Sequence, residues 1–239
     1  MNIKVLTAFP EIFDTYMSTS MMLKARKKSL IEFCAYDLRD WTHDRYKTLD
    51  DATYGGGPGQ LMKCEPIFEA YDSICAKSTC KPFVVIPDPT GEVFDDKLAA
   101  DLSSKQELLF ICGHYEGLDY RVFSLADKII SIGDYILTGA ELACNVIIDS
   151  TVRKLPGVLG ADRGVEEESF SQGLLEYPQY TRPKTYRNMT VPDVLLSGNH
   201  KQIDKWRHEQ SLLRTYRLRP DLINNLNLTE EDKKFLDML

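Results

Sequence analysis

Short apolar runs alternate with amphipathic stretches over the first ~150 residues, and this alternation limits the fold more than any other feature of the chain. Five runs are rich in β-branched or aromatic residues and are bounded by Pro, Gly or polar residues, as strands are. They are Ile3–Phe9, Ile31–Tyr36, Phe83–Ile86, Leu108–Cys112 and Ile129–Ile132. Helix-like stretches lie between them, around 11–28, 65–77, 95–104 and 117–126. The pattern predicts an α/β fold with a largely parallel sheet.

A further helix is predicted after the last strand. Thr138 and Glu141 have the spacing of a capping box, with the Thr as N-cap. The helix is expected over about 139–154, because Pro156-Gly157 stops it.

The rest of the chain has a different character. Gly160 to Gly173 carries three glycines and an acidic run and has no clear period, so we expect a loop. Beyond it we find no strand alternation, and a long helix is expected over 200–219, ended by Pro220. The sequence therefore predicts three parts: a sheet domain at 1–160, a flexible interdomain loop at 161–175, and a small all-helical domain at 176–239.

Charge is distributed unevenly. The chain has a net charge of −7, which argues against a protein that coats nucleic acids non-specifically. Residues 182–219, however, hold nine Lys and Arg against three Asp and Glu. Such a segment is either a polyanion site or a solvated helix face, and charge alone does not decide between them.

Several classes of protein are excluded. The longest apolar run is Leu108–Cys112, far short of the ~20 residues of a transmembrane helix. No secretory signal is expected at Met1–Pro10, and we expect a cytoplasmic protein. The six cysteines and four histidines show no zinc spacing, so we expect no metal ligands. Cys34, Cys112 and Cys144 lie in apolar stretches and are expected to be buried, reduced thiols.

Three glycine-rich segments are candidates for a site. Tyr54–Gly59 holds four glycines and is either a tight turn or a ligand loop; it is neither a P-loop nor a dinucleotide fingerprint. Gly113–Gly117 and Ser131–Gly139 each follow a predicted strand. Open α/β sheets bind ligands at the carboxyl ends of their strands, so these two loops favour a bound small molecule over ordinary turns.

Two charged residues are ambiguous on their own. Arg153 lies at the end of the predicted capped helix, where a cation is favoured by the helix dipole. Glu168 belongs to an acidic run that would be solvated in most proteins.

Taken together, these motifs closely resemble the bacterial tRNA (guanine-N1)-methyltransferase family. The matching residues keep their order and spacing over nearly the whole chain, which is far more specific than any single glycine loop. They are Thr42-His43-Asp44, Asp50-Asp51, Tyr54–Gly59, Cys112–Gly117, Ser131–Gly139, Arg153, Pro156–Gly160, Ser169-Phe170, Gly173–Glu176, Tyr180–Pro183, Val191-Pro192, Leu195–Gly198 and Lys205–Arg207.

The resemblance implies a fold and a reaction. The fold is a SPOUT-type α/β domain with a deep trefoil knot, followed by a helical domain that helps to grip tRNA. The reaction moves a methyl group from S-adenosyl-L-methionine to N1 of guanosine 37, with an expected preference for a guanosine at position 36. The family pattern also implies a homodimer with its active sites at the subunit interface, and assistance by magnesium, although no acidic cluster in the sequence identifies a metal site.

The resemblance also assigns roles to residues. Glu168 stands where the family has an Asp as general base, and Arg153 matches the partner of guanine O6. The donor pocket maps onto Pro89, Gly113, Tyr115, Glu116, Gly117, Ile132, Gly133, Tyr135, Leu137, Gly139, Ala140 and Glu176. Contacts to tRNA are expected at Gly55, Gly56, Gly57, Ser169, Arg182, Arg207 and Arg214.

Three functions stay open at this stage. The first is the methyltransferase. The second is a non-catalytic RNA-binding relative of the same fold, which the replacement of Asp by Glu168 supports and the retained Arg153 opposes. The third is another small-molecule enzyme, such as a nucleotide-dependent oxidoreductase, which the missing G-x-G-x-x-G and the basic segment oppose.

Overall fold

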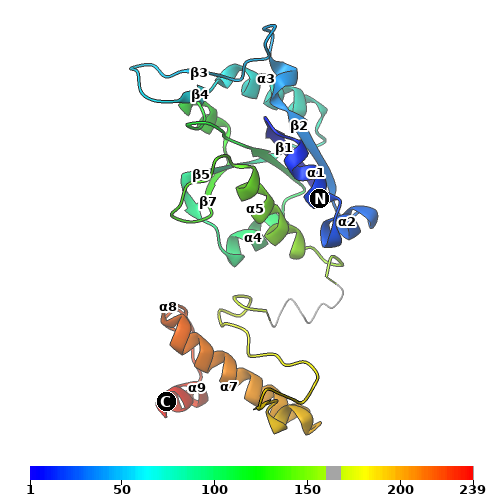
Figure 1. Cartoon of the computed structure of the whole chain (residues 1–239), viewed down its shortest axis with the longest axis vertical. Coiled ribbons are helices and arrows are strands. Elements are labelled where there is room, and N and C mark those ends of the chain that lie inside the picture. Colours follow the sequence, from blue (N-terminus) through cyan, green and yellow to red (C-terminus); the bar gives the residue numbers. More distant parts are fainter. Residues whose placement is uncertain (160–167, 239) are drawn as a thin grey trace. The chain divides into compact units, whose positions relative to one another are not determined.

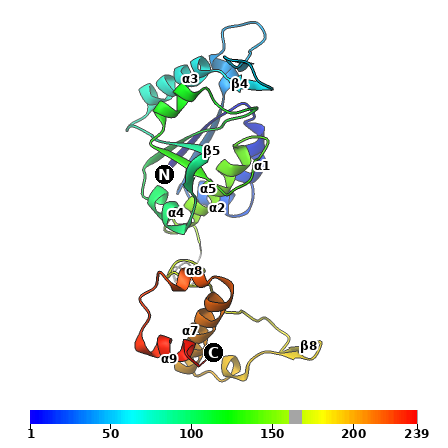
Figure 2. The ribbon, with the colours of Figure 1, turned by 90° about the vertical axis from the view of Figure 1, so that its left-hand side faces the viewer.

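The computed structural model describes residues 1–159 and 168–238. The chain divides into two compact units, 1–160 and 161–239, and each is described here by itself (Figures 1 and 2).

The first unit is built on a five-stranded sheet. Its strands are β1 (Asn2–Thr7), β2 (Glu32–Asp37), β5 (Phe83–Val93), β6 (Glu107–Ile111) and β7 (Lys128–Ser131). They lie in the order β2-β1-β6-β5-β7, and every neighbouring pair is parallel. The predicted α/β fold with a parallel sheet is confirmed. All five residues of the central strand β6 are buried, as expected for a sheet covered on both faces.

Helices cover both faces of this sheet (Figure 2). One apolar cluster joins it to α1 (Glu11–Met17), α2 (Ser20–Lys27), α4 (Asp96–Ser103) and α5 (Glu141–Arg153). On the other face, α3 (Cys64–Lys77) and the 3₁₀ helix η2 (Tyr120–Leu125) pack against a second cluster. A further 3₁₀ turn, η1 (Leu38–Trp41), follows β2.

Three expectations for the helices need correction. The stretch 11–28 forms two helices, because the chain is extended at Thr19 and left-handed at Ser20, with φ +46°. The stretch 117–126 forms the 3₁₀ helix η2 and not an α-helix. The predicted capping box is wrong: the N-cap of α5 is Ala140, and Glu141 accepts a hydrogen bond from Thr7 Oγ1 at 2.8 Å.

The sequence analysis also missed a small hairpin in this unit. Strands β3 (Asp50–Ala52) and β4 (Gln60–Met62) are antiparallel and enclose the glycine segment 54–59. Strands of three residues give too short an alternation to be recognised in a sequence.

The second unit contains α7 (His200–Leu218), α8 (Pro220–Ile223), α9 (Glu230–Leu236) and the 3₁₀ turn η3 (Asp193–Leu196). The long helix ends before Pro220, as predicted. The expectation of an all-helical region is wrong, because β8 (Thr185–Tyr186) and β9 (Met189–Thr190) form a hairpin. Its two central residues, Arg187 and Asn188, have φ values of +48° and +61°, as a two-residue hairpin turn requires.

The structure tests the predictions for the cysteines and for membrane-spanning helices. All six cysteines, each within the described residues, are free thiols. Cys112 and Cys144 are buried with their sulfurs 3.3 Å apart, but Cys34 is exposed on the edge strand β2, against expectation. In the described part of the chain, no helix combines the length and apolar character that crossing a bilayer requires.

Candidate active site

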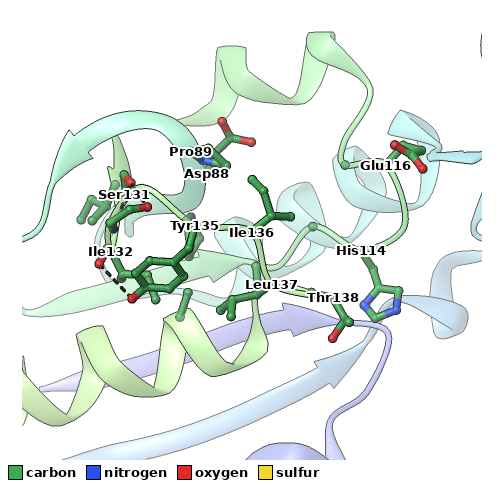
Figure 3. A pocket seen from close by; sticks show the side chains of 18 of the residues that line it. Asp88, Pro89, His114, Glu116, Ser131, Ile132, Tyr135, Ile136, Leu137 and Thr138 are labelled. Atoms are coloured by element: carbon green, nitrogen blue, oxygen red, sulfur yellow. Dashed lines mark hydrogen bonds between the residues drawn. The ribbon is translucent and has the colours of Figure 1, made fainter.

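Three loops meet at the carboxyl edge of the sheet because their strands β6, β5 and β7 are neighbours. The middle strand, β5, has a register shift between Pro87 and Glu92, which takes the residues between them out of the ladder with β7. These residues and the loops 113–117 and 131–139 enclose a cavity of about 380 Å³, which we name the loop cavity (Figure 3). Its volume lies within the ~300–1,000 Å³ typical of small-molecule sites.

Eleven of the twelve residues expected in a donor pocket line the loop cavity. They are Pro89, Gly113, Tyr115, Glu116, Gly117, Ile132, Gly133, Tyr135, Leu137, Gly139 and Ala140. The twelfth, Glu176, belongs to the second unit. The cavity also includes Asp88, His114 and Ile136, which the sequence analysis did not single out (Figure 3). His114 and Ile136 lie inside the quoted motifs and Asp88 precedes Pro89, so strand order would have been enough to include them.

The backbone of the 131–139 loop has a specific shape. Gly133 has a φ of +141°, which L side chains rarely adopt. A Cβ there would lie 2.6 Å from the Tyr135 ring, whose hydroxyl donates to the Ile132 carbonyl at 3.1 Å (Figure 3). The loop is joined to its neighbour because Ala140 N donates to the Gly113 carbonyl at 2.9 Å.

A buried carboxylate lies next to two residues that line the loop cavity, His114 and Gly139. The side chain of Glu141 is 3% exposed, and its Oε2 lies 3.8 Å from His114 Nδ1. The His114 ring packs against Phe9 with centroids 4.7 Å apart. Gly139 is confined here, since a Cβ would come within 2.4 Å of both Glu141 Oε2 and His114 Nδ1. These contacts hold the ends of the two glycine loops together.

The β3–β4 hairpin is tied to the same loops. Glu116 N donates to the Gln60 carbonyl at 3.0 Å, and Met62 N donates to the Gly117 carbonyl at 2.9 Å. Burial and the nearby carboxylate of Asp50 raise the pKa of Tyr115 above its usual range. Three expected tRNA contacts lie at the exposed tip of this hairpin, with φ values of +86°, +77° and +140°: Gly55, Gly56 and Gly57.

Arg153 is the last residue of α5 and is half-buried. Beside it, burial and a hydrogen bond with Asp149 raise the pKa of Tyr16, while the guanidinium opposes that shift. Tyr16 and Asp149 therefore lie near Arg153 on the first unit.

The remaining predicted residues belong to the second unit. Ser169 Oγ accepts a hydrogen bond from Glu176 N at 2.9 Å, and the Glu168 carbonyl accepts one from Ser171 Oγ at 2.7 Å. Arg182 is exposed, whereas Arg207 and Arg214 on α7 are half-buried. The two expected catalytic residues, Glu168 and Arg153, thus come from different units.

The comparison with known proteins agrees with this geometry. The profile of the family described as tRNA (Guanine-1)-methyltransferase TrmD matches residues 1–225. A relative from Sulfurihydrogenibium sp. is 52% identical over 237 residues, covering 99% of this chain and 92% of its own. A relative from Moorella thermoacetica is 47% identical over 239 residues, covering 99% of this chain and 96% of its own. A relative from Bacillus cereus is 48% identical over 240 residues, covering 100% of this chain and 98% of its own. All three are named tRNA (guanine-N(1)-)-methyltransferase. The chain therefore belongs to the tRNA (guanine-1)-methyltransferase family.

Proposed function

We propose that this protein transfers a methyl group from S-adenosyl-L-methionine to N1 of guanosine 37 in tRNA. The observation that carries the proposal is the loop cavity, which gathers the glycine loops of the family pattern at one edge of the sheet. The family relationship supplies the reaction and the class of substrate.

The loop cavity suits the methyl donor in size and chemistry. Glycines at positions 113, 117, 133 and 139 line it and carry no side chain, so a ligand can approach the backbone amide and carbonyl groups there. Such groups can recognise the edge of an adenine and a ribose. Ile132, Ile136 and Leu137 supply apolar surface for the ring. When bound, the donor supplies a methyl group on a positively charged sulfur.

Glu168 and Arg153 serve the acceptor base. Guanine N1 carries a proton at neutral pH and is a poor nucleophile. A carboxylate within hydrogen-bond reach takes that proton, and we assign this role to Glu168. As the proton leaves, negative charge grows on O6, where the guanidinium of Arg153 stabilises it. Glu168 is one methylene longer than the family's Asp, so its loop must compensate.

The second unit and the hairpin bind the tRNA. Arg182, Arg207 and Arg214 lie in the basic segment 182–219 and contact phosphates or bases. Ser169, next to the base, and the open backbone of Gly55, Gly56 and Gly57 contact the anticodon loop. Glu176 helps to orient the donor. In this division, 1–160 binds the donor, 161–175 links the parts, and 176–239 grips tRNA; the expected flexibility of the link concerns mainly residues 161–167, which lie outside the described residues.

A homodimer completes the site. Ile12 on α1 and Leu142 and Val146 on the adjacent α5 are 38%, 58% and 50% exposed. These side chains lie on two helices in contact, of which α5 ends at Arg153, and a second copy covers an apolar face of this kind. The dimer would place each active site at the interface. The knot of the SPOUT-type fold and a cytoplasmic location, where tRNA is found, belong to the same proposal.

Magnesium is the least supported part of the family pattern here. Among residues 1–159 and 168–238, no three His, Cys, Asp or Glu side chains are grouped to hold a metal ion. We therefore assign no step to magnesium.

One assay tests the proposal. Purified protein is incubated with labelled S-adenosyl-L-methionine and unmodified tRNA, and the methyl group is located by nuclease mapping. We expect label on N1 of guanosine 37. Label elsewhere would contradict the assigned position, and tRNA binding without label would favour the non-catalytic RNA-binding relative.

A further inference from the structure

The charged side chains that line the loop cavity are mainly of one sign. Asp88 and Glu116 both line it, and no lysine or arginine is found among its described lining residues. Asp88 is half-buried in the irregular part of β5, and Glu116 is exposed in the loop after β6 (Figure 3). His114 also lines the cavity, but the buried carboxylate of Glu141 lies 3.8 Å from its Nδ1 and would balance a proton there. The cavity therefore presents a net negative charge to a ligand.

The carboxylate of Asp88 is held in place by its own loop. Its Oδ1 accepts hydrogen bonds from Thr90 N at 2.9 Å and from Thr90 Oγ1 at 2.6 Å. Both donors are uncharged, so these bonds orient the carboxylate without neutralising it. A fixed, partly desolvated charge at the wall of a cavity acts more strongly on a ligand than a mobile surface charge does.

The size of the loop cavity keeps a bound ligand close to these charges. A sphere of 380 Å³ is about 9 Å across, which does not exceed the screening length of ~10 Å in 0.1 M salt. Over such a distance, one unit charge at a partly buried site changes the affinity for another by roughly three- to tenfold. Asp88 can therefore act on a charged ligand without touching the charged atom.

The methyl donor and its product differ by one unit of charge. S-adenosyl-L-methionine carries a sulfonium, an ammonium and a carboxylate, so its net charge is positive. When the methyl group leaves, the C–S bond breaks and its electron pair stays on sulfur. The product, S-adenosyl-L-homocysteine, is a thioether without net charge.

We propose that Asp88, together with Glu116, shifts the selectivity of the loop cavity toward the cationic donor and away from the neutral product. The transfer step itself then removes part of the attraction, which favours release of the product and entry of the next donor molecule. The inference rests on the proposed function, since it takes S-adenosyl-L-methionine as the ligand.

The test is a calorimetric titration of the full chain with both compounds, which measures affinity and not activity. Asp88→Asn should lower the ratio of donor affinity to product affinity by about three- to tenfold. Its amide oxygen can still accept both bonds from Thr90, so the loop is kept. Sinefungin, a stable analogue with a protonated amine in place of the sulfonium, should lose affinity as the donor does.

Glu92→Gln is the matched control. Glu92 also belongs to β5, but it lies outside the loop cavity and pairs with Lys128 at 2.5 Å. Its removal changes the net charge of the protein by the same amount, and the affinity ratio should stay at the wild-type value.

Two results would overturn the inference. If Asp88→Asn weakens both compounds equally or neither of them, the carboxylate contacts at most a group that they share, such as the ribose. If Glu92→Gln lowers the ratio as much as Asp88→Asn does, the effect belongs to the overall charge and not to the cavity. In both cases the two compounds still bind, whereas binding of neither would refute the proposed function itself.

Discussion

Gly133→Val should abolish tight binding of the methyl donor. Gly133 has a φ of +141°, and holding another residue in such a conformation costs about 1–3 kcal/mol. The new Cβ would also lie 2.6 Å from Tyr135 Cε1. The ring would have to leave and would lose its hydrogen bond to the Ile132 carbonyl, at a cost of about 1 kcal/mol.

Together, the backbone strain and the lost hydrogen bond cost about 2–4 kcal/mol. In the free protein the loop can avoid this cost by adopting another conformation, but donor binding would then have to restore the original one. Affinity should therefore fall by about 30- to 700-fold. Calorimetry with S-adenosyl-L-homocysteine measures the change. Gly157→Val is the matched control, because Gly157 has a φ of +81° but meets only Leu30 Cδ1, at 3.7 Å, away from the loop cavity. Wild-type affinity in Gly133→Val would refute the assignment of the loop cavity.

Three further predictions concern tRNA binding and stability. Arg214→Ala should weaken tRNA binding and lower the slope of log affinity against log salt by roughly one, as measured by a salt titration; an unchanged slope at low salt would mean a solvated face. Lys4→Met should destabilise the protein by about 3–5 kcal/mol in urea unfolding, because it leaves the buried Glu107 carboxylate, 2.7 Å from Lys4 Nζ, without its cation. Adding Glu107→Leu should restore most of the lost stability. A Lys4→Met variant as stable as the wild type would contradict this. Burial opposes ionisation of Asp232, yet hydrogen bonds with His208 and Thr229 hold its pKa below the ordinary 3.8. The stability that ionised Asp232 contributes is thus complete above about pH 4 and is lost as the pH falls through the folded-state pKa. Between about pH 6 and pH 3, the Asp232→Asn variant should therefore lose less stability than the wild type. Equal losses in the two proteins would contradict the argument.

The sheet could be predicted from the sequence mainly because its inner strands, such as β1 and β6, are buried. Each of the five runs, such as Leu108–Cys112, is apolar enough to distinguish it from the helices around it. The meeting of the loops 113–117 and 131–139 followed from the same alternation, since parallel strands bring their carboxyl ends to one edge.

The local errors have tertiary causes. Thr138 has the right spacing for an N-cap, but Gly139 pairs with His114 and Ala140 N bonds to Gly113, so the loop cavity determines this backbone. Glu141, expected to cap the helix, turns inward to Thr7 for the same reason. No local pattern contains these contacts, because the partners are up to 134 residues apart.

Arg207 shows another limit of sequence reasoning. Arg207 was expected to contact tRNA because it lies in a basic segment. Its partial burial and its position over the Tyr177 ring depend on how the segment 168–177 packs against α7. Charge counting cannot separate an arginine of this kind from a solvated neighbour such as Lys205, which is 75% exposed.

The most direct test of the account is the single-turnover rate of methyl transfer by Glu168→Gln. The amide keeps the size of the side chain but cannot take the proton from guanine N1. We predict wild-type affinity for tRNA and donor and a rate lower by about 10²–10⁴-fold, with Glu168→Asp retaining activity. A Gln variant as fast as the wild type would show that another group takes the proton, and would contradict the mechanism.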